Sequence, residues 1–208
     1  ELDRWLISML QSLIDEVNTQ MEGYYLYKVV PAVLSFIDHL TNWYIRRSRR
    51  RFWGSLSIET AQDKADAFQT LYHCLVTFSK VLAPVLPFLS EAIYQHLVVE
   101  MGVDKDGEDS VHLCDYPVVQ SQYIDERLES QISLTREVVS LGRALREKHK
   151  LKTRQPLQAV TVVHHDAQVR EDLAAQAHLL TTELNVKEVR LEASDAELTN
   201  VSFQANFK

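Results

Sequence analysis

Five arginines fall within six positions, at residues 46–51, in a chain of 208 residues whose net charge is -7. Aromatic residues flank them on both sides, in the order Trp43, Tyr44, Phe52 and Trp53. A guanidinium group binds phosphate through two parallel hydrogen bonds and also stacks on flat rings, which suits RNA. The segment therefore predicts either an RNA contact or a helix whose charged face is merely solvated.

A second basic zone lies more than ninety residues further along the chain. Its six basic residues are Arg143, Arg146, Lys148, Lys150, Lys152 and Arg154. Positive charge near a helix C-terminus is stabilised by the macrodipole, by about 0.3 to 1 kcal/mol per exposed charge. That effect accounts for one or two of these residues but not for six. Because the rest of the chain is acidic, a polyanion would have to bind at these two zones.

The residues that would support catalysis or metal binding are not arranged for either. The five glycines are scattered and form no phosphate-binding loop. The pairs His73–Cys74 and His112–Cys114 each lack the second pair that a structural zinc site needs. The polar loop at 102–110 lacks the ligand spacing of a helix-loop-helix calcium site. The sequence therefore predicts a binding module with no catalytic residue, metal or cofactor of its own.

Composition bounds the class of protein. Hydrophobic residues make up 46% and charged residues 25%, as in ordinary globular proteins. No apolar run approaches the roughly 20 residues of a membrane-spanning helix. Two cysteines do not form a secreted disulfide framework, which favours a reducing compartment such as the cytoplasm. The chain opens inside a helical pattern, without an initiator methionine or signal peptide, and we interpret it as a piece of a longer protein.

Apolar spacing of three and four residues dominates the first 150 positions and predicts a mainly α fold, an antiparallel helical bundle. Gly23 and Gly54 are placed to end the first two helices. The expected helices cover residues 2–22, 27–52, 58–82, a stretch beginning at Pro87, and 123–150. A short extended piece is expected at 111–116.

After Pro156 the pattern changes to a small α/β unit. The β-branched run at 159–163 and the alternating run at 186–191 predict strands, and 201–207 is a third possible strand. Residues 166–181 return to a helical pattern. The predicted domains are a helical bundle at 1–118, a long helix with a basic junction at 119–156, and an α/β unit at 157–208.

Helical phase divides the arginines of the second helix into two groups, at about 100° per residue. The core stripe consists of Val33, Ile37, Leu40 and Tyr44. Arg46, Arg49 and Arg50 lie on the opposite face and are expected to meet solvent or a partner.

Arg47 and Arg51 instead continue the core stripe, where an unpaired charge is costly. They must either pair with carboxylates or emerge past the end of the bundle. The conceivable partners are Asp3, Asp63, Asp66 and Glu91.

Four segments, in this order, resemble one family. Leu2–Ser8 is similar to the first helix of the anticodon-binding domain in class I aminoacyl-tRNA synthetases of the isoleucine, valine and leucine group. Asn42–Arg51 and Leu82–Glu91, followed by Ser110–Leu113, resemble the isoleucyl enzyme in its eukaryotic or archaeal-like form. Residues 141–157 resemble the segment that follows the helical domain there.

The resemblance implies a function that composition and periodicity do not reveal. The family joins isoleucine to its tRNA with ATP, in a catalytic domain with His-Ile-Gly-His-like and Lys-Met-Ser-Lys-Ser-like signatures, and this chain contains neither. The implied role is to hold the anticodon arm of tRNA(Ile), while the parent enzyme's catalytic domain uses ATP. The implied partners are that tRNA and the remainder of the synthetase chain, with no DNA and no membrane.

The sequence and the resemblance together give a set of candidate tRNA-binding residues. Phosphate contacts are predicted for Arg46, Arg49, Arg50, Lys152 and Arg154, and stacking on unpaired bases for Trp43, Tyr44 or Trp53. Two alternatives remain. One is a non-catalytic protein-interaction module that docks through the basic helix end, and the other is the same domain of a valyl or leucyl enzyme.

Overall fold

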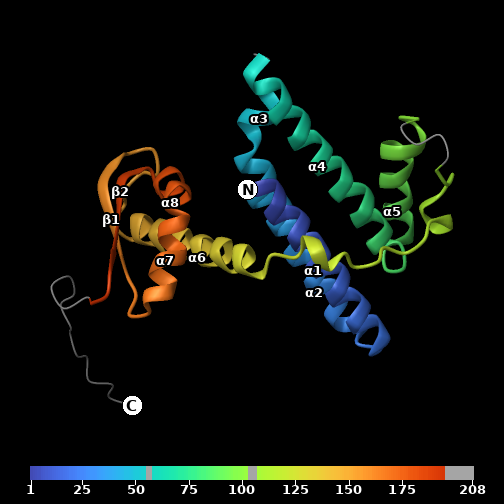
Figure 1. Ribbon diagram of the computed structural model, residues 1–208, viewed down its shortest axis with the longest axis horizontal. Coiled ribbons are helices and arrows are strands. Elements are labelled where there is room, and N and C mark those ends of the chain that lie inside the picture. The colour runs from blue at the N-terminus through green and yellow to red at the C-terminus, as the bar shows by residue number, and fades with distance from the viewer. Residues whose placement is uncertain (55–57, 103–106, 195–208) are drawn as a thin grey trace. The chain divides into compact units, whose positions relative to one another are not determined.

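A computed structural model of the chain divides after Glu126 into two compact units, residues 1–126 and 127–208 (Figure 1). The structure describes residues 1–54, 58–102 and 107–194. Helices make up most of both units, and a two-stranded sheet belongs to the second. The prediction of a mainly α fold with a small α/β unit is confirmed.

The first unit is built from helices joined by short turns. Its elements are α1 (Leu2–Glu22), α2 (Leu26–Asp38), the π-helix η1 (His39–Ile45), α3 (Arg49–Trp53), α4 (Ile58–Leu82), α5 (Pro87–Tyr94), the π-helix η2 (Gln95–Val99) and the 3-10 turns η3 (Val111–Leu113) and η4 (Ser121–Tyr123). The first helix has the predicted bounds. The expected extended piece at 111–116 begins instead as a 3-10 turn, because the Ser110 side chain caps it by accepting a hydrogen bond from the His112 backbone N–H.

The core of this unit lies where α1 packs against α2 and α4. Trp5, Leu6 and Ile14 present the buried face of α1, and Phe36 of α2 meets Phe78 of α4 with ring centroids 5.1 Å apart. Full burial of a large apolar side chain contributes about 1.5–3 kcal/mol, so this seam fixes how the helices pair.

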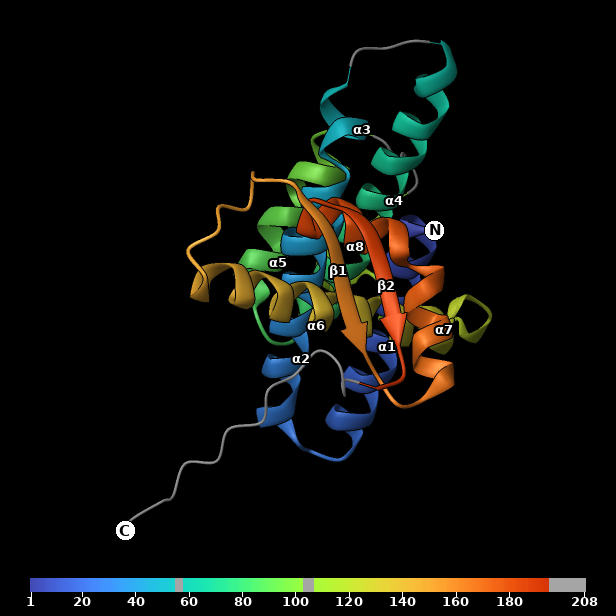
Figure 2. The ribbon, with the colours of Figure 1, turned by 90° about the vertical axis from the view of Figure 1, so that its left-hand side faces the viewer.

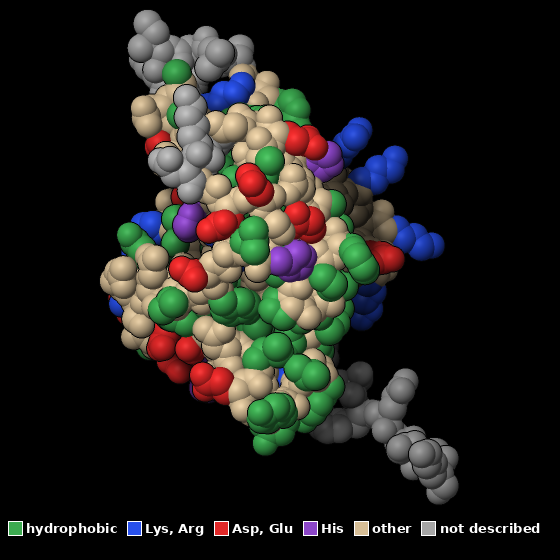
Figure 3. Space-filling model, turned by 90° about the vertical axis from the view of Figure 1, so that its right-hand side faces the viewer, with side chains coloured by type: hydrophobic (Ala, Val, Ile, Leu, Met, Phe, Trp, Pro, Cys, Tyr) green, Lys and Arg blue, Asp and Glu red, His purple; other side chains and the backbone are tan. Residues whose placement is uncertain are grey.

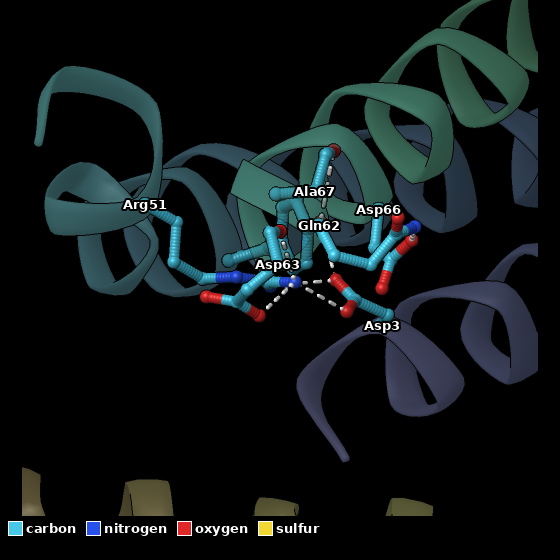
Figure 4. Close-up of polar contacts among 7 residues, drawn as sticks. Asp3, Arg51, Gln62, Asp63, Asp66 and Ala67 are labelled. Atoms are coloured by element: carbon cyan, nitrogen blue, oxygen red, sulfur yellow. Dashed lines mark hydrogen bonds and ion pairs between the residues drawn. The ribbon is translucent and has the colours of Figure 1, made fainter. Parts of the chain in front are cut away.

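One ion-pair network ties four helical elements together, and we call it the Arg51 network: Asp3, Tyr44, Arg51 and Asp63. The Arg51 guanidinium donates to both carboxylate oxygens of Asp3, at 2.8 and 2.7 Å, and lies 2.9 Å from Asp63 Oδ1 (Figure 4). The Tyr44 hydroxyl donates to Asp3 Oδ1 at 2.6 Å. The network joins α1, η1, α3 and α4 with charge-assisted hydrogen bonds, which are the strong ones.

The turn between α1 and α2, together with the outer face of α2, is apolar and exposed. The side chains concerned are Tyr24, Tyr25, Leu26, Tyr27, Val30 and Leu34. Figure 3 shows hydrophobic side chains gathered at the lower end of one face, where Figure 1 places this turn. A group of exposed apolar side chains normally marks an interaction surface, so this face suits contact with another surface.

The second unit is a βαβ arrangement with one long helix added. Its elements are α6 (Glu126–Lys148), β1 (Leu157–Val163), α7 (Ala167–Ala175), α8 (Ala177–Leu184) and β2 (Val186–Glu192). The two strands run parallel, with Val160 opposite Val189 (Figure 2). A parallel pair needs a crossover, and α7 and α8 supply it. The strand predicted at 201–207 lies outside the described residues.

The long helix α6 belongs structurally with the second unit. Gly142 leaves room for Leu184 of α8, whose methyl groups would lie 2.7 and 2.9 Å from an added Cβ. Arg143 pairs with Glu183, and Gln131 donates to Asp172. The division after Glu126 therefore differs from the predicted boundaries at 118 and 156, because α6 packs along its length on the α/β elements.

Replacing Arg51 with alanine leaves Asp3 and Asp63 without their cation. We expect Arg51→Ala to lower the free energy of unfolding by about 2–3 kcal/mol, since a half-buried charge loses its partner. Chemical denaturation of the 208-residue chain measures this. The matched control is Arg50→Ala, which removes an exposed arginine and should change stability by no more than about 0.5 kcal/mol. Equal effects of the two substitutions would contradict the role of the network.

The network also predicts an acid dependence. Burial alone would raise the pKa of the Asp3 carboxyl, but hydrogen bonds from Arg51 and Tyr44 and the charge of Arg51 outweigh it and hold that pKa below its usual range. The stabilisation is therefore complete above about pH 4, the unfolded value, and is lost as pH falls through the lower folded-state pKa. The stability difference between the wild-type chain and Asp3→Asn should shrink below about pH 4. A difference that stays constant down to about pH 2 would refute this.

Candidate nucleic-acid interface

The segment that carries the five arginines is helical from α2 to α3, with a π-helical turn in the middle. Its buried residues recur at every fourth position, at Phe36, Leu40, Tyr44, Ser48 and Phe52. A regular α-helix has 3.6 residues per turn, so a strict four-residue stripe would drift around it. The wider π-helical turn keeps the stripe facing the core, and π-turns occur frequently at functional sites.

On the side away from that stripe lie Arg46, Arg49, Arg50 and Trp53, which we call the arginine ridge. Arg49 and Arg50 are exposed, and no ion pair or hydrogen bond engages either side chain within the described residues. Trp53 is 72% exposed. The helical phase correctly placed Arg49 and Arg50 on the surface, so both guanidinium groups can meet a phosphate.

Arg46 is more restrained than the helical phase predicted. Its Nε donates to the Asn42 carbonyl at 2.8 Å, and its guanidinium lies 5.6 Å from the centre of the Trp43 ring. The side chain is half-buried as a result. Arg46 therefore contributes charge to the arginine ridge from a position fixed by its own helix.

Trp43 and Tyr44 are corrections to the predicted set of stacking residues, because both lie in the core. For Tyr44, burial agrees with the core stripe that helical phase predicted. Trp43 is 3% exposed beneath Arg46 and Arg47, and Tyr44 is fully buried with its hydroxyl on Asp3. Neither ring can stack on an RNA base in this conformation. Among the three aromatic candidates, Trp53 alone keeps a surface position.

Gly54 explains why the ridge ends where it does. A Cβ at this position would run into the backbone carbonyl of Arg50. The Gly54 N–H donates to that same carbonyl at 2.9 Å and closes α3. The exposed Trp53 is thereby held at the last turn of the helix, with its ring edge against Phe52, 5.9 Å away between centroids.

The side chains of Arg51 and Arg47 make contacts on the inner side of the helix, as their helical phase predicted. Arg51 makes the ion pairs expected with Asp3 and Asp63, whereas the Arg47 guanidinium lies 5.5 Å from the centre of the Trp43 ring. Two of the conceivable carboxylate partners are engaged elsewhere. Asp66 accepts from Gln62, and Glu91 accepts from Ser110 and the Val111 N–H.

The second basic zone lies in the other unit, where α6 ends. Lys148, Lys150, Lys152 and Arg154 are all exposed and form no ion pair within the described part of the chain. The two candidates Lys152 and Arg154 therefore lie on the surface, together with Lys148 and Lys150, which belong to the same basic zone but were not among the predicted tRNA-binding residues. We call residues 148–154 the basic loop.

Arg146 is the residue in this zone whose role the sequence interpretation missed. It is 5% exposed, although it was grouped with the surface cations. Its position continues the buried stripe of α6, formed by Leu128, Ile132, Thr135 and Val139. The three-to-four residue spacing of that stripe was the signal that could have found it.

No group of three His, Cys, Asp or Glu side chains that could hold a metal ion occurs among the described residues. Cys74 is buried, and burial raises the pKa of its thiol to about 12, which keeps it protonated at neutral pH. None of the helices in the described ranges is long and apolar enough to cross a membrane.

Known proteins resemble the chain over its whole length. A model of the anticodon-binding domain of tRNA ligase matches residues 3–161. An isoleucine–tRNA ligase of Protochlamydia amoebophila is 42% identical over 207 residues, and those of Chlamydia trachomatis serovar L2 and Chlamydia muridarum are 45% and 44% identical over 208 and 211 residues. Each comparison covers 100% of this chain and 19% of the relative.

The matched family region begins in α1 and ends within β1, so it takes in the helical unit, the long helix and the basic loop. The chain spans about a fifth of the length of the curated relatives that it matches. On this match, which covers well over half of its residues, the chain belongs to the family of anticodon-binding domains of tRNA ligases.

Proposed function

We propose that the chain is the tRNA-binding portion of an isoleucine–tRNA ligase and that it holds the anticodon arm of tRNA(Ile). The observation that carries the proposal is the pair of exposed cationic surfaces, the arginine ridge and the basic loop, on a chain of net charge -7. Its relatives named isoleucine–tRNA ligase support the choice of amino acid. Aminoacylation with ATP would take place in a catalytic domain outside these residues, in the cytoplasm.

The binding mechanism is electrostatic docking followed by stacking. Arg49 and Arg50 present guanidinium groups with no competing carboxylate among the described residues, so each is available to take a phosphate in bidentate geometry. Neutralised phosphates release counterions, which makes the affinity depend on salt. Trp53 at the end of the ridge offers its ring to an unpaired base.

The second partner that we propose is the remainder of the ligase chain. The apolar outer face of α2 is the surface that suits such a contact, because tyrosine, valine and leucine side chains are exposed there together. A protein-interaction role and an RNA-binding role are therefore carried by different surfaces of the first unit. Competition by cognate tRNA, compared with unrelated RNA, distinguishes specific RNA binding from docking on an acidic protein.

Charge reversal on the ridge tests the proposed contact with phosphates. In the full-length ligase, Arg49→Glu with Arg50→Glu should weaken tRNA(Ile) binding by about tenfold or more at low salt. The slope of log affinity against log salt should become shallower by about 0.7–0.9 for each phosphate that is no longer neutralised. Lys187→Glu, at an exposed position of β2, is the single-charge control for the reversal of each arginine. Unchanged affinity and slope in the double variant would remove the ridge from the interface.

Stacking by Trp53 has its own signature. Trp53→Ala should weaken binding by about 1–3 kcal/mol, with no change in the salt slope, because no charge is removed. Trp53→Phe should recover most of the affinity, since it retains an aromatic face. Thermal unfolding should be nearly the same for both variants, as the side chain is largely exposed. Full affinity in Trp53→Ala would show that no base stacks there.

A further inference from the structure

The basic loop is held in one conformation by backbone hydrogen bonds at the end of α6 and by the side chains of Arg146 and Asn185. The first of these lie where α6 ends: the Leu151 N–H donates to the Arg146 carbonyl at 2.8 Å and the Lys150 N–H to the Glu147 carbonyl at 2.9 Å. This is the paired closure of a Schellman motif, which requires a left-handed residue between helix and loop. That residue is Lys150, with φ at 55°.

A lysine at this position costs stability. Glycine adopts the left-handed region without strain, whereas a side chain with a Cβ costs roughly 1–2 kcal/mol there. In return, the strained residue places an exposed ammonium group at the start of a loop that already carries Lys152 and Arg154. A lysine at this strained position therefore fits a role in binding a ligand and not a role in stabilising the fold.

Arg146 holds the loop from inside. Its guanidinium donates to the carbonyl of Lys152 in the loop and to that of Gln155, the residue directly after the loop, at 3.1 and 3.0 Å. The other end of the same group donates to the carbonyls of Leu184 and Asn185, at 2.6 and 3.3 Å. Carbonyls satisfy its hydrogen bonds but do not neutralise its charge, and no carboxylate pairs with it among the described residues. A positive charge therefore stays beneath the loop.

Asn185 holds the middle of the loop. Its side-chain amide donates to the carbonyls of Thr153 and Arg154, at 3.2 and 3.0 Å. Asn185 is itself left-handed, with φ at 49°, a conformation that asparagine tolerates better than most residues. Arg146 and Asn185 together bind four consecutive carbonyls, those of residues 152–155.

This arrangement decides what the loop presents to solvent. Carbonyl oxygens carry partial negative charge and would repel a phosphate, but here four of them in a row accept hydrogen bonds from inside the unit. The outer side is left to the cationic side chains. A site that is already ordered loses less conformational entropy when it binds, which raises affinity.

We propose that the basic loop is a preformed site for backbone phosphates of RNA, in which Lys150 is a contact residue and Arg146 and Asn185 are positioning residues. The proposal rests on the proposed function for its ligand, the tRNA, and goes beyond it in assigning these three roles. An acidic protein surface is the competing ligand that the experiment must separate from RNA.

Two substitutions in the full-length ligase test the two roles through tRNA(Ile) binding measured against salt. Lys150→Gly removes a cation and relieves backbone strain, so binding should weaken about three- to tenfold and the salt slope should fall by about 0.7–0.9, while the thermal midpoint stays equal or rises. Asn185→Gly keeps the left-handed backbone and the net charge but removes the amide. It should also weaken binding and flatten the slope, because the cations are no longer held in place.

The controls separate failure of this inference from failure of the proposed function. Lys187→Gly, on the exposed face of β2, removes the same charge from the same unit as Lys150→Gly does, and should leave binding unchanged. If the wild-type ligase binds tRNA and both loop variants bind it with wild-type affinity and slope, the inference is overturned and the proposed function stands. If the wild-type ligase does not bind tRNA, the proposed function fails.

Discussion

A guanidinium group that leaves water must find hydrogen-bond acceptors inside the protein, and this requirement organises both units of the chain. The two terminal nitrogens of Arg51 bind the carboxylates of Asp3 and Asp63, and the guanidinium of Arg146 donates to four backbone carbonyls. An unmatched charge at either position would cost several kcal/mol. Each of these arginines fixes the backbone next to it, and the neighbouring cations are thereby left on the outside.

The two inward arginines differ in what they do to local charge. Arg51 meets two carboxylates, so the Arg51 network adds little positive potential to the arginine ridge, which depends on Arg49 and Arg50 themselves. Arg146 donates to carbonyl dipoles, so its charge adds to that of the basic loop above it. The first unit thus separates structural from surface arginines, whereas in the second unit a structural arginine also strengthens the surface field.

Helical periodicity was sufficient to predict the helices, and the β-branched and alternating runs predicted the change to an α/β unit after Pro156. Helical phase also separated the inward Arg51 from the exposed Arg49 and Arg50, but it placed Arg46 further outward than it lies. The prediction failed for aromatic residues, which suit both a buried core and an exposed RNA-binding surface. Trp43 and Tyr44 fit a stacking platform and a core equally well by composition, and the π-helical turn η1 that brings Tyr44 onto Asp3 has no evident sequence signal. The interior role of Arg146 was readable from the spacing of buried residues in α6. The contribution of Asn185 could not be predicted from the sequence. It depends on a left-handed backbone conformation, and the Thr153 carbonyl that it binds is 32 residues away along the chain.

In the proposed complex, the outward cations of the ridge and the basic loop bind RNA phosphates, while Arg51 and Arg146 remain inside. The most direct measurement is the structure of the full-length ligase bound to tRNA(Ile). We expect phosphate oxygens within hydrogen-bond distance, about 3 Å, of Arg49 or Arg50 and of Lys150, Lys152 or Arg154. A complex in which both surfaces face solvent or another protein segment, with the RNA bound elsewhere, would contradict the proposal.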